Sequence, residues 1–124
     1  MNEEVPENLK KAAIFQLVSG LVNMFVLPTL IWTGISVCTA VTFGFGGVLG
    51  ICGMFSCLLG PIGIFEVIAG GVGLANPKSG GQLMRFATYA EFASILGGGI
   101  HSAVVGYLVS NMLDDAEVQM FLEG

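Results

Sequence analysis

Apolar, glycine and small polar residues run almost without interruption from Ala12 to Pro77, and the one formal charge in this stretch is Glu66. A small water-soluble domain keeps a large polar exterior, so it could not hide this much apolar surface from water. Lipid is therefore the expected solvent. The pattern predicts an all-α, polytopic membrane protein that forms a single transmembrane helical domain over residues 1–124.

A membrane-spanning helix needs about 20 apolar residues. The chain divides into four such spans, at about residues 11–32, 35–59, 61–75 and 83–113. Pro6 and Glu7 suit the first turn of the first helix, and Pro28 is expected to kink it near its end. Gly60-Pro61 separates the second span from the third. A three-span alternative, in which residues 35–75 form one broken helix, stays open.

Two polar stretches mark the limits of the apolar part. Residues 76–81 (NPKSGG) are expected to form a polar loop between the third and fourth spans. Beyond the fourth span, residues 114–122 predict a short helix that lies along the membrane surface or under the helical bundle. Asp114 and Glu117 in this helix have the spacing of a capping box, and Val118, Phe121 and Leu122 give it an apolar edge.

Charge and cysteine content narrow the range of partners and cofactors. Hydrophobic residues make up 54% of the 124 residues, and the mean hydropathy is +0.85. The four cations, Lys10, Lys11, Lys78 and Arg85, are too few and too scattered for a nucleic-acid surface. The three cysteines, Cys38, Cys52 and Cys57, lack metal-ligand spacing and are interpreted as small buried hydrophobic residues. We expect no metal and no cofactor.

The same cations bear on membrane orientation. With four spans, Lys10 and Lys11 fall on the opposite side of the membrane from Lys78 and Arg85, so the distribution of Lys and Arg gives no orientation. With three spans, all four cations would share one side. Helical spans favour a bacterial inner membrane, with an outer membrane as the alternative.

Small and polar residues recur at helical spacing within each predicted span. Such stripes are the faces that helices present to one another in lipid, where polar groups need protein partners. In the first span they are Gln16, Ser19, Gly20 and Asn23, and in the fourth Glu91, Ser94, Gly98 and His101. The expected helix-contact glycines of the second and third spans are Gly46, Gly50, Gly53, Gly63, Gly70 and Gly73.

Glu66 is the most informative single residue, because a carboxylate in hydrocarbon is costly unless it is protonated, paired or facing water. One interpretation is a proton or cation site shared with Glu91 and His101. The other is a hydrogen-bonded glutamate that joins helices. Glu91 lies near the start of the predicted fourth span, so its side chain could also reach the membrane surface. No catalytic constellation is visible in the sequence, so a non-enzymatic role is expected.

Three stretches carry a resemblance to a known group: KAAIFQLVSGLVN at residues 11–23, GIFEVIAG at residues 63–70 and DAEVQMF at residues 115–121. Together they resemble small bacterial four-helix membrane proteins that end their last span in a similar acidic, Glu-Val, aromatic motif. The group includes porin-like proteins of predatory bacteria that form rings enclosing lipid. The resemblance implies a homo-oligomeric ring whose partners are membrane lipids and further copies of the chain.

Two hypotheses follow from the sequence. The first is a homo-oligomeric integral membrane protein with a structural, lipid-binding or lipid-enclosing role. The second is a small channel or proton-coupled transporter in which Glu66 titrates, with Glu91 or His101 as its partner.

Overall fold

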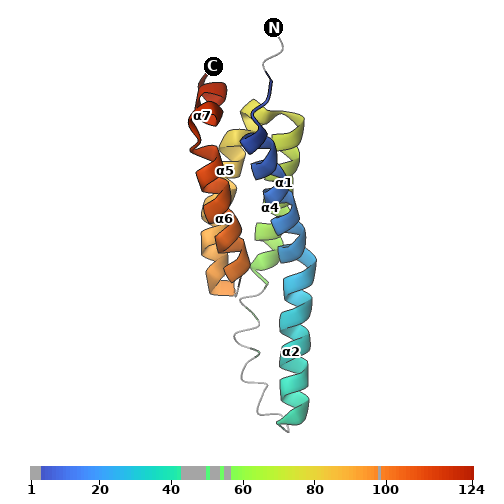
Figure 1. Cartoon of the computed structure of the whole chain (residues 1–124). Coiled ribbons are helices and arrows are strands. Elements are labelled where there is room, and N and C mark those ends of the chain that lie inside the picture. Colours follow the sequence, from blue (N-terminus) through green and yellow to red (C-terminus); the bar gives the residue numbers. More distant parts are fainter. Residues whose placement is uncertain (1–3, 43–49, 51–53, 55–56, 98) are drawn as a thin grey trace.

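The computed structural model describes residues 4–42, 50, 54, 57–97 and 99–124, and within them every regular element is helical. The prediction of an all-α protein is therefore confirmed for the described residues. Figure 1 shows the helices running roughly side by side, with both chain termini at one end of the molecule.

The chain begins with one continuous helix of 35 residues, Glu7–Val41. It consists of α1 (Glu7–Leu21), a π-helical turn η1 (Val22–Val26) and α2 (Leu27–Val41). Pro28 lies in the first turn of α2, directly after the π-helical turn, whose wider winding makes room for the proline ring. The helix continues through Pro28, so the predicted end at residue 32 is wrong. Residues 35–41, assigned to the second span, belong to this first helix.

The next two helices follow each other with only Asn76 between them. α4 (Leu59–Ala75) confirms that the predicted third span is helical, and α5 begins at Pro77 and ends at Ala93. Pro77 suits the first helical turn, and Asn76 caps it by accepting a hydrogen bond from the Ser79 N–H at 3.5 Å. The predicted loop at residues 76–81 is therefore wrong, because the capped helix starts inside it.

The predicted fourth span, residues 83–113, is two antiparallel helices. α5 ends at Ala93, a 3₁₀ turn η3 (Ser94–Gly97) follows, and α6 (Ile100–Leu113) runs back beside α5. The Ser94 hydroxyl joins the two ends, because it donates to the carbonyl of Glu91 at 2.6 Å and lies 3.1 Å from that of Gly99. A Cβ at Gly99 would lie 2.6 Å from this hydroxyl oxygen, so the reversal depends on glycine at that position.

The short C-terminal helix is confirmed as α7 (Ala116–Glu123). Its cap is Asp115, whose Oδ1 accepts a hydrogen bond from the Glu117 N–H at 2.9 Å, so the predicted capping box of Asp114 and Glu117 is wrong. Val118 is buried in the core, and Phe121 and Leu122 pack partly against it. The predicted apolar edge is thus confirmed, and it packs α7 against the end of the bundle that holds the termini.

α1, α4, α5 and α6 form a four-helix bundle. α1 and α5 each contact both α4 and α6, and α2 extends α1 beyond the bundle without a single buried residue (Figure 1).

At 1.5 Å per residue, the 17 residues of α4 span about 25 Å and the helix Glu7–Val41 about 50 Å. Among the described residues, only this first helix is both long and apolar enough to cross a membrane. Four separate membrane spans are therefore not confirmed.

Glycines let α1 and α4 approach until their backbones touch. A Cβ added at Gly63 would lie 2.6 Å from the Gly20 carbonyl oxygen, and one added at Gly70 would lie 2.6 Å from that of Ala13. At the turn between α4 and α5, a Cβ at Gly80 would overlap the backbone of Gly73. Close backbone approach through small residues is typical of helix pairs in lipid.

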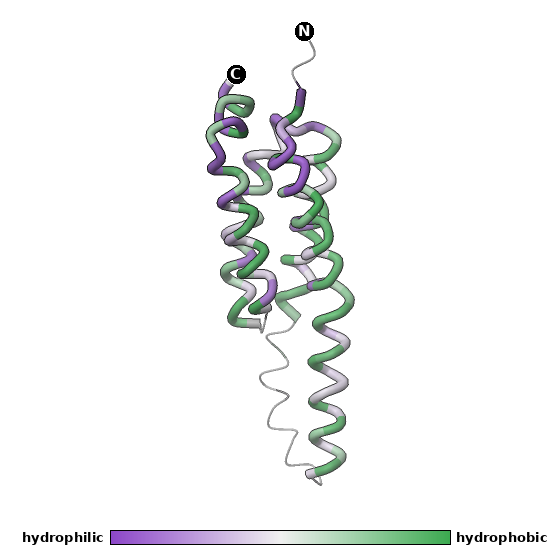
Figure 2. Tube along the Cα trace, viewed as in Figure 1, coloured by the Kyte–Doolittle hydropathy of each residue, from purple (hydrophilic) through white to green (hydrophobic). Residues whose placement is uncertain are grey.

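The bundle buries polar as well as apolar side chains, and its outer surface is largely apolar. Its fully buried side chains include Gln16, Asn23, Glu66 and Glu91, whereas large apolar side chains cover the surface of α1, α4 and α6. Figure 2 shows hydrophobic residues along most of the length of the helices, with hydrophilic residues gathered at the end that holds the termini. A soluble bundle covers an apolar core with a polar exterior, whereas here many large apolar side chains lie outside and several polar ones lie inside.

Almost all charged residues of the described part lie near the end of the bundle that holds the termini. At this end, Asn8 donates a hydrogen bond of 3.2 Å to Asp115, and Arg85 forms an ion pair of 3.4 Å with Asp114. The exceptions are Glu66 and Glu91, which are buried inside the bundle. Lys10 and Lys11 lie in the first turns of α1, Lys78 lies in the first turn of α5, and Arg85 reaches Asp114 beyond the end of α6. The four cations therefore share one end, in contrast to the opposite placement predicted for four spans.

The glycine contacts give a prediction with a matched control. Gly70→Ala places a methyl group against the α1 backbone, whereas Gly71→Ala places it where no atom lies within 4 Å. We expect Gly70→Ala to lower the free energy of unfolding by about 1–3 kcal/mol because the helices must move apart. Gly71→Ala should leave it unchanged or raise it by up to about 1 kcal/mol, since alanine favours the helix.

Circular dichroism during SDS titration of the protein in mixed micelles measures both variants. Equal losses of stability in Gly70→Ala and Gly71→Ala would contradict the close contact between α1 and α4.

Candidate functional site

A polar stripe on the first helix faces the inside of the bundle. Gln16, Ser19 and Asn23 follow one another at spacings of three and four, which keeps them on one face. Gln16 and Asn23 are fully buried, and Ser19 is 2% exposed. The prediction that this face contacts other helices is confirmed.

Glu66 is the centre of the buried polar cluster. It is fully buried on α4, and the Asn23 amide nitrogen on η1 lies 2.9 Å from each of its two carboxylate oxygens. The Ser102 hydroxyl on α6 donates to Glu66 Oε1 at 3.0 Å. Donors from two other helices thus replace the water that a carboxyl group loses on burial.

Ser102 connects the cluster to α1. Its hydroxyl oxygen lies 2.8 Å from the Asn23 amide nitrogen and 3.4 Å from the Ser19 hydroxyl. Sequence reasoning missed Ser102, because residues 83–113 were expected to form one helix with His101 on its polar face. With α6 as a separate helix, Ser102 shares a face with Gly106, Val109 and Leu113, all of which are buried.

Glu91 is also buried within the bundle. Its side chain is fully inaccessible to solvent, so the alternative that it reaches the membrane surface is wrong. Gly106 of α6 makes room for it, since a Cβ at Gly106 would lie 2.7 Å from Glu91 Oε2. Neither carboxyl oxygen of Glu91 has a hydrogen-bond partner among the described residues.

Gln16 and Asn23 add further unsatisfied polar atoms. Both side-chain polar atoms of Gln16, and Oδ1 of Asn23, are buried without a hydrogen-bond partner in the described part of the chain. Along α1, Gln16 lies one helical turn from Ser19, which contacts Ser102. An unpaired buried amide or carboxyl group is costly, so these atoms favour a bound water, proton or small cation inside the bundle.

His101 does not join Glu66. Its side chain is half-buried, and neither ring nitrogen has a hydrogen-bond partner among the described residues. The neighbouring Ser102 makes the contact with Glu66 instead. Of the three residues expected to share one site, Glu66 and Glu91 are fully buried inside the bundle, whereas His101 is only half-buried.

The predicted helix-contact glycines have mixed outcomes. Gly63, Gly70 and Gly73 are confirmed as close contacts, whereas Gly50 has no atom of the described residues within 4 Å of an added Cβ. Gly46, Gly53 and Gly98 lie outside the described residues. Close contacts also occur at Gly20, Gly80, Gly99 and Gly106. None of these was among the predicted helix-contact glycines, although Gly20 was placed in the polar stripe of the first span.

The cysteines are not buried where the structure describes them. Cys38 and Cys57 are exposed on the surface of the single chain, which corrects their interpretation as buried hydrophobic residues. Cys52 lies outside the described residues. No group of three or more His, Cys, Asp or Glu side chains that could hold a metal ion occurs in the described ranges.

The cluster can be tested by a double-mutant cycle on its central pair. Asn23→Ala and Glu66→Ala each remove one side of a contact inside the bundle, so the effects of the two substitutions on the free energy of unfolding should not add. We expect a coupling energy of about 0.5–2 kcal/mol. The measurement is again SDS titration in mixed micelles.

Thr29→Ala provides the control for this cycle, because the exposed Thr29 hydroxyl bonds only to the carbonyl of Phe25 in its own helix. Its effect should add to that of Glu66→Ala within the experimental error. A coupling of zero between Asn23 and Glu66 would show that the contact does not join the two helices.

The comparisons with known proteins leave the cluster to be interpreted from its own chemistry. No protein-family model, no curated protein and no solved structure matches the chain. The resemblance carried by residues 11–23, 63–70 and 115–121 therefore stays a prediction. What the structure establishes is an all-helical chain with one candidate membrane-spanning helix and a polar cluster buried among apolar helices.

Proposed function

We propose that the protein is a multi-pass integral membrane protein that binds lipid, associates with further copies of itself and has a structural, non-enzymatic role. The observation that carries this proposal is the largely apolar outer surface of the bundle around a buried polar cluster. Asn23, Glu66 and Glu91 are fully buried, while Ile68, Val104 and Leu30 are among the large apolar side chains that are at least half exposed.

The energetic argument favours lipid as the solvent. In water, each large apolar side chain left exposed forfeits about 1.5–3 kcal/mol relative to its burial. In hydrocarbon the same side chains cost nothing, and the free energy favours polar groups that meet one another inside the bundle. The hydrogen bonds of Asn23 and Ser102 to Glu66 fit this second case.

Self-association is supported by the part of the chain that the bundle does not use. Gly20, Gly63 and Gly70 are already occupied by contacts within one chain, so they are not available to a second copy. α2 has no buried residue, and no atom of the described residues lies within 4 Å of a Cβ added at Gly34. We propose that copies contact one another through α2, and that a ring formed in this way encloses lipid.

The distribution of Lys and Arg gives an orientation for the proposed membrane protein. Lys10, Lys11, Lys78 and Arg85 lie near one end of the bundle together with both termini. Lys and Arg are retained on the cytoplasmic side of bacterial membranes, whereas Asp and Glu contribute little to orientation. We therefore place both termini on the cytoplasmic side of an inner membrane, with an outer membrane as the alternative location.

Native mass spectrometry of the full chain, extracted gently from membranes, tests this proposal. We expect a defined oligomer with several bound phospholipids. Gly34→Leu should shift the protein toward smaller species, while Gly71→Leu, which also enters open space in the single chain, should not. A lipid-free monomer as the only species of the unmodified chain would contradict the proposal.

A small channel or proton-coupled transporter is the second candidate, and one observation favours it. Glu91, Gln16 and Asn23 present buried polar atoms without a hydrogen-bond partner among the described residues. Together with the Glu66 carboxyl group, they supply the oxygen ligands that a proton, a water molecule or a small hard cation requires.

Glu66→Gln separates the two candidates. The amide keeps one acceptor oxygen for the donors Asn23 and Ser102, so the oligomer and its bound lipid should be unchanged under the structural role. Under the transport role, proton or cation flux into liposomes that contain the protein should be lost. Flux through the unmodified protein that disappears in Glu66→Gln would favour the second candidate, and absence of flux in both would oppose it.

A further inference from the structure

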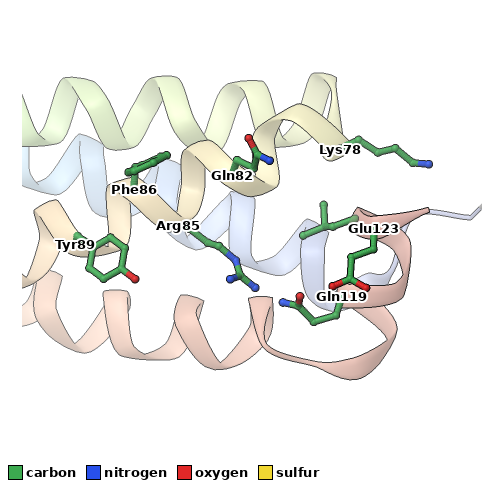
Figure 3. A pocket seen from close by; sticks show the side chains of 8 residues that line it. Lys78, Gln82, Arg85, Phe86, Tyr89, Gln119 and Glu123 are labelled. Atoms are coloured by element: carbon green, nitrogen blue, oxygen red, sulfur yellow. The ribbon is translucent and has the colours of Figure 1, made fainter.

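A groove between α5 and α7 lies at the end of the bundle where the charged residues gather. It encloses a volume of about 600 Å³ and is lined by polar and apolar side chains, among them Lys78, Arg85, Phe86, Tyr89, Gln119 and Leu122. Figure 3 shows that Lys78, Arg85, Phe86 and Tyr89 come from α5, and that Gln119 approaches from α7 on the opposite side. The groove is separate from the buried cluster around Glu66.

The lining changes from cationic to aromatic along α5. Lys78 is in the first turn of the helix, Arg85 lies two turns further on, and Phe86 and Tyr89 follow (Figure 3). From Lys78 to Tyr89 the helix advances by about 16 Å. A phospholipid at the edge of a membrane has the same order of chemistry, with a phosphate at the surface and acyl chains below it.

Arg85 is placed to bind a phosphate. Its Nη2 atom contacts Asp114 Oδ1 at 3.4 Å, and this is the one ion pair that the structure gives it within the described ranges. The guanidinium group has five N–H donors in a planar fork that suits phosphate oxygens. Lys78, whose ammonium nitrogen lies 5.4 Å from the centre of the Phe121 ring, adds a second positive charge to the groove.

The apolar part of the groove favours a ligand that has a hydrocarbon part. Phe86 and Tyr89 are 65% and 72% exposed, and both belong to the lining. A soluble anion would contact the cations and leave these two rings in contact with solvent. Glu123 also lines the groove and Asp114 pairs with Arg85, so the local charge is close to balanced and disfavours a multiply charged anion.

We infer that this groove is a binding site for a single phospholipid, with its phosphate held by Arg85, the rest of its headgroup toward Lys78 at the polar end of the groove, and an acyl chain lying on Phe86 and Tyr89. The inference rests on the proposed location of the protein in a membrane and adds the site and the chemical group that is recognised. The polar end of the groove lies beside α7, which places the headgroup at the proposed cytoplasmic surface.

The experiment compares two double variants of the full chain in detergent titrated with dioleoylphosphatidylglycerol. Lys78→Gln with Arg85→Gln removes both cations of the groove, and Lys10→Gln with Lys11→Gln removes two cations from the first turns of α1, outside the groove lining. Native mass spectrometry counts the lipids bound per subunit. We expect binding of one lipid per subunit to weaken about tenfold in the groove variant alone, since charge-assisted bonds are lost.

The alternatives give different results. If the unmodified protein binds no phospholipid, both the groove site and the proposed lipid-binding role fail. If it binds phospholipid and the two double variants bind it equally well, only the groove site fails. Inorganic phosphate that competes with the lipid at equal concentration would identify a site for a free anion and overturn the inference. A changed subunit number with unchanged lipid binding would identify a contact between copies and would also overturn it.

Discussion

The buried carboxyl group of Glu66 constrains the arrangement of the bundle more than any other group. It lies among apolar helices where water cannot solvate it, so its donors must come from neighbouring helices. Asn23 and Ser102 supply them, which fixes the height of η1 and α6 relative to α4. A shift of one helix by a single residue would turn these donors away. Apolar contacts between helices allow several registers, and the hydrogen bonds to Glu66 select one of them.

Glycine makes this register possible. Gly20, Gly63 and Gly70 bring α1 and α4 into backbone contact, and Gly106 provides the space for Glu91. In the proposed lipid environment the solvent is as apolar as the side chains, so close contact and hydrogen bonds would carry the association of the helices. The same glycines are thereby used within one chain, whereas α2 has no buried residue among its described positions.

Helical periodicity predicted the inner faces well, because any helix in lipid must turn its polar residues inward. It placed Gln16, Asn23 and Glu66 inside, and it identified Gly63 and Gly70 as contacts. It failed at the positions where helices begin or end. The reversal near Gly99 depends on the hydroxyl of Ser94, and the start of α5 depends on the cap at Asn76. Ser102 was missed for the same reason, since its role appears only when α6 is a separate helix.

Spin labels in lipid nanodiscs can measure whether lipid covers the apolar outer surface of the bundle. In a chain with its cysteines replaced by serine, labels are placed at Ile68 and Val104, which are 50% and 56% exposed. We expect collision rates with molecular oxygen, which dissolves in hydrocarbon, well above those with a water-soluble nickel chelate at both positions. Faster collisions with the nickel chelate at these positions would show that water covers this surface and would rule out a lipid-facing bundle.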